Sequence, residues 1–370
     1  MLRIGIDWVM LGAALLLAGA GLVSMAGFSG DAGFAERQLI WVCLGLVLFF
    51  VLALFDLRFL RRTPVVVACY LVAALLLALL FVFGSVFSGA QGWFNLGFFA
   101  LQPADPAKFA LILVLAKYFS RRHVEIARFR HIAISGAYAG VIFLLLFFQP
   151  DFGSAAIVGA VWLGMVLIAG IPFRFVAGLV GTGVIACILL WNFGFAEYQK
   201  ARIMTFVHPL SDIRGSGYNA FQSTVAIGSG GMFGQGVGYG TQSRLEFLPQ
   251  HETDFIFASF AEEWGFFGVV LLLCVFGALI ARIVVHAERG ETNFESLFSL
   301  GVAVIFLVHA TVHIGSNIGL LPVTGTTLPF MSYGGSHLLV EFTLLGMVNA
   351  MSRYGRAVRP QHATEVVGLT

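Results

Sequence analysis

The chain has 370 residues, of which 59% are hydrophobic and 11% are charged, and its mean hydropathy is +0.93. Soluble domains carry about 25% charged residues, and a single soluble core stops growing beyond roughly 250–300 residues, so this composition excludes an ordinary soluble protein. The net charge of +2 is too small to indicate a nucleic-acid partner.

Ten apolar runs follow one another along the chain, each near the length that a helix needs to cross a bilayer. They cover residues 8–28, 39–55, 65–84, 108–119, 131–149, 154–171, 173–195, 260–281, 296–320 and 337–352. The fourth run reaches span length only with residues before Lys108, and a turn at Pro172 separates the sixth run from the seventh. The first run lacks a small-residue cleavage site, which favours an uncleaved span. The sequence therefore predicts an all-α integral membrane protein with about ten transmembrane helices.

The positions of Lys and Arg predict which side of the membrane each loop occupies, because cytoplasmic loops are enriched in them. With the N-terminus inside, most of the 21 Lys and Arg residues fall in inner segments near 3, 58–62, 117–130, 174, 282–289 and 353–359. The outer segments hold Arg37, Lys108, Lys200, Arg202, Arg214 and Arg244. The bias alternates at every loop, so we expect both termini to lie in the cytoplasm.

This arrangement puts the segments 85–107, 196–259 and 321–336 on the outer side. The longest of them lies between the seventh and eighth spans. We expect one membrane domain over residues 1–359, with its large extracytoplasmic loop at about 196–259, and a disordered cytoplasmic tail at 360–370. Cys43, Cys69, Cys187 and Cys274 each lie inside an apolar run, and their spacing favours buried thiols over disulfides or a metal site.

Asp254 is the carboxylate whose position is most informative. It closes the long outer loop and is followed directly by Phe255, Ile256 and Phe257. Partial desolvation at such an edge suits a carboxylate to act as a general base near pH 7. Asp just before a helix is also a common N-cap, and position alone favours the cap.

Other polar residues near this loop leave alternatives open. Glu262 and Glu263 follow Asp254 within three helical turns, either as further carboxylates for substrate or metal, or as polar contacts in the bundle. Lys108, Arg202 and Arg244 lie on the outer side against the positive-inside bias. Either phosphate recognition or pairing with nearby carboxylates would explain them.

Two further patterns are weaker. Nine glycines lie between residues 215 and 240, where tight turns and close helix approach are favoured over a phosphate loop, because no βαβ unit surrounds them. Tyr218, Phe221 and Val225 recur there at helical spacing and suggest a short interfacial helix. His309 and His313 have the i, i+4 spacing of a zinc pair, yet packing or polar helix contacts are favoured.

Motifs spread over the chain resemble the SEDS family (shape, elongation, division and sporulation), and within it the RodA branch. The motifs are Gly89–Trp93, Gln102-Pro103, Lys108, Gln149–Ala155, Tyr198-Gln199 with Arg202, Ala226–Gly231, Gly240–Ser243, Leu245–Pro249, Thr253–Ala258, Leu321–Gly325, Leu328–Phe330 and Ser332–Ser336. The chain departs from the family pattern at Gly92, at Asp105-Pro106, at Gln250 and Glu252, and at His337, where a small residue is common.

The resemblance implies a peptidoglycan glycosyltransferase that polymerises lipid II during cell-wall elongation, with Asp254 as the essential catalytic carboxylate. Candidate residues for binding the substrate and its pyrophosphate are Lys108, Arg202, Arg244, Asp105, Trp93, Gln102, Glu246 and Ser332. A divalent cation, Mg²⁺ or Mn²⁺, is expected as the sole candidate cofactor, with no organic cofactor.

Lipid II, a class B penicillin-binding protein (a transpeptidase) and other elongation-complex proteins are the expected partners, in the bacterial cytoplasmic (inner) membrane. Two other functions remain open on the sequence. A lipid II flippase or other transporter predicts inverted repeats and charges deep in several spans, of which the chain shows little. A non-catalytic scaffold of the wall-synthesis complex predicts that changes at Asp254 are tolerated.

Overall fold

The computed structural model describes most of the chain. The described residues are 5–28, 33–87, 90–95, 97, 100–121, 129–195, 197–207, 216–245 and 247–358. Each of the ten predicted apolar runs overlaps a helix. These helices are α1 (Trp8–Ala26), α2 (Phe34–Leu54), α3 (Thr63–Phe83), α4 (Ala104–Ser120), α5 (Phe129–Phe148), α6 (Phe152–Ile168), α7 (Phe173–Leu189, continued by the π turn η2, Leu190–Gly194), α11 (Ile256–Glu288), α12 (Asn293–Asn317) and α13 (Gly335–Val358).

Seven of the helices within the described part of the chain are long and apolar enough to cross a membrane, namely α1, α2, α3, α5, α7 with η2, α11 and α12. The other three differ for plain reasons. Helices α4 and α6 have only 17 residues each, and α13 carries charged residues such as Glu341 and Arg353. The chain is thus a largely helical protein with several membrane-spanning helices.

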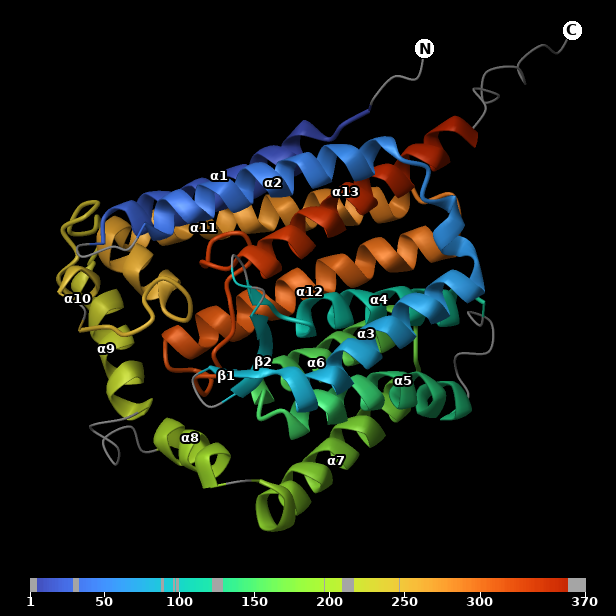
Figure 1. The fold of residues 1–370 in the computed structure, drawn as a ribbon, viewed down its shortest axis with the longest axis horizontal. Helices are drawn as coiled ribbons and strands as arrows, with labels where there is room; N and C mark the ends of the chain where they lie inside the picture. Colours follow the sequence, from blue (N-terminus) through green and yellow to red (C-terminus); the bar gives the residue numbers. More distant parts are fainter. Residues whose placement is uncertain are drawn as a thin grey trace, which may run out of the picture.

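The long helices form one bundle whose members run between two ends (Figure 1). Helices α1, α2, α11 and α13 lie together along one side, and α12 lies between them and the group of α3, α4, α5 and α6. Helix α4 contacts α3, α5, α6, α12 and α13, and most of its side chains are buried. Polar residues carried by α4 are therefore placed inside the protein.

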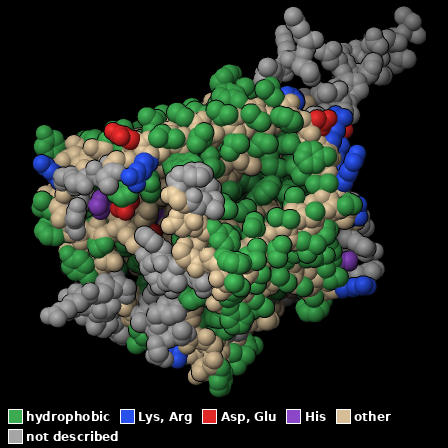
Figure 2. Space-filling view, in the orientation of Figure 1, with side chains coloured by type: hydrophobic (Ala, Val, Ile, Leu, Met, Phe, Trp, Pro, Cys, Tyr) green, Lys and Arg blue, Asp and Glu red, His purple; other side chains and the backbone are tan. Residues whose placement is uncertain are grey.

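One end of the bundle gathers the connections that the charge pattern assigns to the cytoplasm. Arg61, in the 3₁₀ turn η1 (Arg58–Arg61), forms ion pairs with Glu291, which lies between α11 and α12, and with Glu295 in the first turn of α12. Lys117 donates a hydrogen bond to the Arg61 carbonyl. Figure 2 shows Lys and Arg side chains along this edge, and hydrophobic side chains over the face between the two ends. The cation-rich segments far apart in sequence therefore meet at one end.

The opposite end contains a small sheet that the all-α prediction missed. Strands β1 (Ser85–Phe87), β2 (Ala90–Asn95) and β3 (Ala100–Leu101) pair antiparallel in the order β1-β2-β3. Ser85 also donates its hydroxyl hydrogen to the Trp93 carbonyl at 2.8 Å. A short excursion between two spans leaves backbone groups without helical partners, and the hairpin pairs them.

The long segment that the charge pattern assigns to the outside contains, in its described residues, the short helices α8 (Glu197–Val207), α9 (Ser216–Ser229) and α10 (Thr241–Arg244). The short helix expected from Tyr218, Phe221 and Val225 is therefore present as α9. Figure 1 shows α8 and α9 at this end, turned away from the direction of the long helices. Helix α9 packs against α11 and α12, so the segment covers one end of the bundle.

The expectation of buried thiols is wrong for Cys43 and Cys274. Both are exposed and free, and Cys69 is half-buried and free. They lie on outer surfaces of α2, α3 and α11, where a thiol acts as a small hydrophobic group facing lipid as readily as facing a core. The side chain of Cys187 lies outside the described part of the structure.

Candidate active site

Asp254 lies in the turn that enters α11, one residue before the N-cap position. That position is occupied by Phe255, whose side chain makes no capping bond, so the N-cap interpretation of Asp254 is not the one that the structure adopts. The Asp254 side chain is half-buried. A Cβ atom added to Gly325 would lie 3.5 Å from Asp254 Oδ2, which shows how closely the 321–325 segment passes the carboxylate.

The backbone around Asp254 is held by side chains from elsewhere in the chain. Asn317, at the end of α12, donates from Nδ2 to the Asp254 carbonyl at 3.0 Å and to the His313 carbonyl at 2.9 Å. Its Oδ1 accepts the backbone N–H of Ala258 at 3.2 Å. Asn317 is fully buried, so one amide side chain joins the Asp254 turn, α11 and α12.

Ser332 anchors the other side of this turn. Its hydroxyl donates to the Thr253 carbonyl at 2.8 Å and accepts the Leu328 N–H at 2.8 Å. The Tyr333 N–H donates to the Glu252 carbonyl at 2.8 Å. The predicted site residue Ser332 is therefore buried and contacts the backbone of the residue before Asp254.

Lys108 and Asp105 form a buried ion pair at the start of α4, with Nζ and Oδ1 3.0 Å apart. His309 Nε2 lies 3.5 Å from Lys108 Nζ, and His309 Nδ1 faces the Thr327 carbonyl at 3.4 Å. The segment 324–328 thus passes between the Lys108 region and Asp254. The structure brings Asp105 and Lys108 together, and connects them to the Asp254 turn through that segment.

Trp93, Gln102 and Arg244 lie at the same end of the bundle. Trp93 is half-buried on β2, and the Gln102 N–H donates to the Ser336 hydroxyl at 3.3 Å. Arg244 is exposed on α10. Arg202 lies on α8, but its side chain is outside the described part of the structure, as is the whole of Glu246.

Glu262 and Glu263 are polar contacts within the bundle. Glu262 Oε1 accepts the Gln242 N–H at 3.0 Å and the Thr241 hydroxyl at 3.2 Å. Glu263 Oε1 accepts the Gly238 N–H at 2.9 Å. Both carboxylates therefore hold the glycine-rich segment against α11.

The glycine-rich segment makes close backbone contacts, as expected. A Cβ at Gly230 would lie 2.1 Å from the Ala261 carbonyl oxygen, and one at Gly234 would lie 2.0 Å from that of Glu263. The N–H groups of Gln235 and Gly236 donate to the carbonyls of Glu262 and Glu263 at 3.0 Å each. These carbonyls are free to accept because α11 is broken at Gly265, where φ is 65°.

The side chains that the structure describes do not fit a resident metal. Among the described residues, no three His, Cys, Asp or Glu side chains are grouped so that they could ligate one ion. His313 Nδ1 faces the Thr326 carbonyl at 2.7 Å, and His309 faces Lys108 and Thr327. The two histidines make the polar helix contacts that the sequence favoured.

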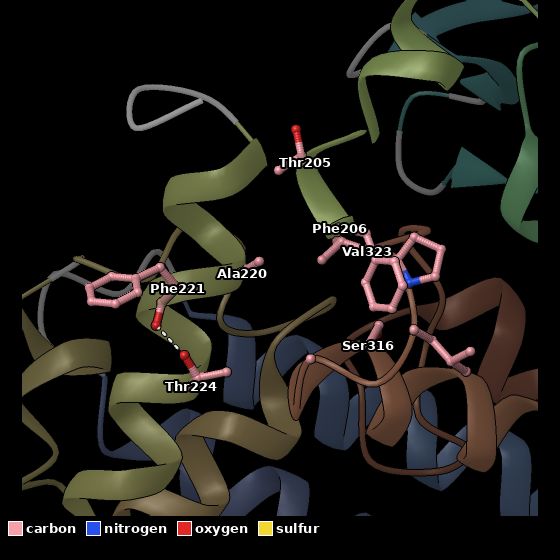
Figure 3. Close-up of a pocket in the computed structure, with 10 residues that line it drawn as sticks. Thr205, Phe206, Ala220, Phe221, Thr224, Ser316 and Val323 are labelled. Carbon is pink, nitrogen blue, oxygen red and sulfur yellow. Dashed lines mark hydrogen bonds between the residues drawn. The ribbon is translucent and has the colours of Figure 1, made fainter. Parts of the chain in front are cut away.

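An apolar cleft opens beside the site. Figure 3 shows Ala220, Phe221 and Thr224 of α9 on one side, and Phe206, Ser316 and Val323 on the other. Val323 also packs against the small buried cluster that contains Phe255. The cleft is therefore continuous with the wall of the Asp254 turn.

The site includes residues that the sequence analysis did not identify. Gln38 Nε2 donates to the Ser332 carbonyl at 3.0 Å, and Asn317 holds the Asp254 turn. Both are amides inside or at the end of an apolar helix, where an unpaired polar group is unfavourable. An amide at such a position in the sequence was therefore the feature that could have predicted a buried hydrogen-bonding role for Gln38 and Asn317.

Comparison with known proteins gives one consistent result. A family model described as "Cell cycle protein", which covers FtsW, RodA and SpoVE, matches residues 1–357. The chain is 36% identical over 337 residues to "Peptidoglycan glycosyltransferase MrdB" of Escherichia coli K12, covering 90% of this chain and 89% of that protein. It is 34% identical over 339 residues to "Stage V sporulation protein E" of Bacillus subtilis, covering 89% of each.

Solved structures agree with these relatives. One described as "Structural coordination of polymerization and crosslinking by a peptidoglycan synthase complex" matches with a TM-score of 0.82 and 31% identity, over 95% of this chain and 98% of the other. The crystal structure of the Thermus thermophilus rod shape determining protein RodA matches with a TM-score of 0.72 and 31% identity, over the same shares. The family match, the relatives and the shared fold together show that the chain belongs to the FtsW/RodA/SpoVE family.

Proposed function

We propose that this chain is a peptidoglycan glycosyltransferase that polymerises lipid II into glycan strands during cell-wall elongation. The observation that carries the proposal is the placement of Asp254, a half-buried carboxylate in a turn clamped by Asn317 and Ser332, beside an apolar cleft. Relatives named peptidoglycan glycosyltransferase support the reaction class.

In the proposed reaction Asp254 accepts the proton of the acceptor sugar's 4-hydroxyl. The hydroxyl oxygen forms a bond to the anomeric carbon of the lipid-linked donor strand, with inversion. The bond from that carbon to the pyrophosphate oxygen breaks, and its electron pair leaves with undecaprenyl pyrophosphate. A base within a partly desolvated turn is suited to this proton transfer.

Cations are needed where the leaving pyrophosphate gains negative charge. Lys108, Arg202 and Arg244 are the proposed cations, with Asp105, Trp93, Gln102, Glu246 and Ser332 as neighbouring residues of the substrate site. The buried Asp105 carboxylate fixes the position of the Lys108 ammonium at 3.0 Å. Any Mg²⁺ or Mn²⁺ would be carried mainly by the pyrophosphate oxygens of the substrate, as Mg²⁺ is at many phosphate sites.

The proposed topology has ten spans, with both termini in the cytoplasm of a bacterium and the 196–259 segment on the outer face of the inner membrane. The contacts of Arg61 and Lys117, which join inner segments at one end of the bundle, support it. The polyprenyl tail of the substrate would stay in the membrane beside the apolar cleft. The match to a peptidoglycan synthase complex supports a class B penicillin-binding protein as partner.

The test is polymerisation of lipid II by the purified full-length protein, with and without a class B penicillin-binding protein and divalent metal. Asp254→Asn is expected to lower the rate about 10²–10⁴-fold, because it removes the general base while leaving the fold. Asp56→Asn, an exposed carboxylate beside η1 at the other end of the bundle, is the matched control and should retain the wild-type rate.

Three outcomes would contradict the proposal. Wild-type polymerisation by Asp254→Asn would remove Asp254 from the reaction. Movement of labelled lipid II across liposomes without glycan formation would indicate a flippase. Full function of every Asp254 variant that still binds the partner would indicate a scaffold.

A further inference from the structure

Five ionisable side chains, two of them histidines, meet inside the bundle where α4, α12 and α13 touch. Lys108 and Asp105 come from α4, His309 from α12, and His337 and Glu341 from α13. Asp105, Lys108, His309 and Glu341 are each at most 4% exposed, and together with His337 they line a small internal cavity. We call these five residues the α4–α13 cluster.

His337 is the bridge of the α4–α13 cluster. Its Nδ1 lies 3.2 Å from Asp105 Oδ1, and its Nε2 lies 2.9 Å from Glu341 Oε1. The first contact is a hydrogen bond, and the second is an ion-pair contact without good hydrogen-bond geometry. Both ring nitrogens thus face a carboxylate oxygen, and because an ionised carboxylate can only accept, this placement favours a proton on each ring nitrogen.

His309 has the opposite arrangement. Its Nε2 faces Lys108 Nζ at 3.5 Å, and an ammonium group can only donate. The proton of a neutral His309 ring therefore belongs on Nδ1, which faces the Thr327 carbonyl. With His309 neutral, the charges of Lys108 and His337 balance those of Asp105 and Glu341. With Asp105 and Glu341 both ionised, the cluster is neutral only when His337 is an imidazolium.

Neutrality matters because the cluster is enclosed by protein. An uncompensated charge at such a place is strongly unfavourable, and removing one partner of a buried pair is more harmful than removing both.

The cluster also reaches the Asp254 turn. Glu341 Oε2 accepts the Phe330 N–H at 2.8 Å, and Phe330 has a positive φ of 63° and is almost fully buried. Two residues later, Ser332 donates to the Thr253 carbonyl. On the cluster's other side, Asp105 holds Lys108. His337 therefore connects Lys108, the cation proposed to bind the pyrophosphate, with the turn that carries Asp254, the proposed base.

We propose that His337 is a positioning residue, which as an imidazolium between Asp105 and Glu341 neutralises the α4–α13 cluster and thereby fixes both Lys108 and the Phe330 turn. This role rests on the proposed function of Lys108 and Asp254, although the charge balance itself does not depend on any reaction.

The experiment compares four full-length proteins: wild type, His337→Gln, Glu341→Gln and the double variant His337→Gln/Glu341→Gln. His337→Gln leaves one negative charge unbalanced. Glu341→Gln leaves a cluster that His337 can neutralise by releasing one proton, and Gln can still accept the Phe330 N–H. The double variant retains only the balanced Asp105–Lys108 pair. The readouts are the thermal unfolding midpoint in detergent, and kcat and KM for lipid II per folded molecule.

We expect His337→Gln to lower the unfolding midpoint and to lower kcat about 10- to 100-fold with little change in KM. Displacement of Lys108 and of the Asp254 turn would mainly weaken stabilisation of the transition state. Glu341→Gln should stay within about threefold of wild type, and the double variant should recover most of both losses. Equal losses in the two single variants, or a double variant no better than His337→Gln, would overturn the proposal.

The outcomes also separate this proposal from the proposed function. If the wild type makes no glycan under any condition, the proposed function fails, while the order of the four midpoints still decides the charge role of His337. If His337→Gln does not fold, recovery of folded protein in the double variant supports the neutral cluster, and its absence rejects it. If the wild type is active and His337→Gln is unchanged in rate and midpoint, only the inference about His337 is wrong.

Discussion

At the scale of single residues, the Asp254 turn depends on an amide whose partners lie on three different segments. Asn317 contacts the carbonyls of Asp254 and His313 and the N–H of Ala258. Its own carbonyl accepts the Ser223 hydroxyl of α9 at 2.8 Å. Because Asn317 is fully buried, no water is expected to replace these bonds without rearrangement.

Asn317→Ala is therefore expected to lower the free energy of unfolding by about 1–3 kcal/mol, since it leaves buried backbone groups without partners. It should also lower lipid II polymerisation, because the Asp254 carbonyl loses its anchor. Thermal unfolding and the polymerisation assay measure the two effects. Asn192→Ala is the matched control, because Asn192 is exposed and bonds only the Ile188 carbonyl of its own helix. An Asn317→Ala protein as stable as Asn192→Ala would contradict the role of Asn317.

Asp7, just before α1, is expected to make stability depend on pH. Burial alone would raise the pKa of Asp7, but hydrogen bonds from Arg282 and from the Met10 N–H, and the charges of His286 and Arg282, bring that pKa below its ordinary value. A lowered folded-state pKa contributes stability above the ordinary value, and that contribution is lost as the pH falls through the folded-state pKa.

Wild type should therefore unfold at a higher temperature than Asp7→Asn near neutral pH, and the gap should narrow as the pH falls below about 4. Thermal midpoints of both proteins in detergent at several pH values measure the gap. A gap that stays constant down to about pH 2 would show that the charge of Asp7 does not contribute.

At the scale of elements, the break in α11 and the glycine-rich segment form one structure. Gly265 interrupts the helix, and the N–H groups of Phe266 and Phe267 donate instead to the carbonyls of Gly231 and Met232, at 2.9 and 3.2 Å. The glycine-rich segment in turn satisfies carbonyls of α11. Each segment therefore supplies backbone partners that the other lacks.

Gly230→Ala tests this close approach. The added Cβ would lie 2.1 Å from the Ala261 carbonyl oxygen, so one backbone must move, and we expect the free energy of unfolding to fall by about 1–3 kcal/mol. Gly228 lies two residues earlier, within α9, and a Cβ added there would have no atom within 4 Å. Gly228→Ala should therefore change the free energy of unfolding by less than about 0.5 kcal/mol. Thermal unfolding of the two variants provides the comparison, and equal stabilities would contradict the packing described.

At the scale of the whole molecule, the two ends of the bundle differ in chemistry. One end gathers Arg61, Lys117 and Arg282 with their carboxylate and carbonyl partners. The other carries the small sheet, α8 to α10 and the Asp254 turn. The proposed topology assigns the first end to the cytoplasm and the second to the outside.

Cysteine labelling tests that assignment in a variant whose four native cysteines are replaced by Ala. A membrane-impermeant maleimide added to intact cells should label Leu245→Cys, and should label Arg58→Cys only after the membrane is opened. Both side chains are exposed in the protein. Val72→Cys, which is exposed on α3 within a span, is the control and should resist labelling in both cases. Labelling of Arg58→Cys in intact cells would overturn the topology.

The positions of the long helices follow from local features of the sequence, and the same kind of feature predicts the side of each loop. Hydrophobicity and charge act on each segment separately, because the bilayer selects apolar helices of a given length and retains Lys and Arg on one side. Helix α9 was likewise predictable from Tyr218, Phe221 and Val225. The sequence predicted that Asp254 lies at the entrance to a helix. It did not predict that Phe255 rather than Asp254 occupies the N-cap position, because cap geometry depends on how the turn is held in the folded protein.

Only the tertiary structure decided what these residues contact. Asp105 and His337 are separated by 232 positions, and Asn317 and Asp254 by 63, so no spacing rule pairs them. The sheet at 85–101 forms by backbone pairing, and the weak side-chain pattern of its residues does not predict it. Glu262 and Glu263 proved to hold the glycine-rich segment. The sequence by itself determined a protein of many apolar helices with Asp254 at the entrance to one of them. The packing of distant helices decided which polar groups share that site, because buried groups find their partners in space rather than along the chain.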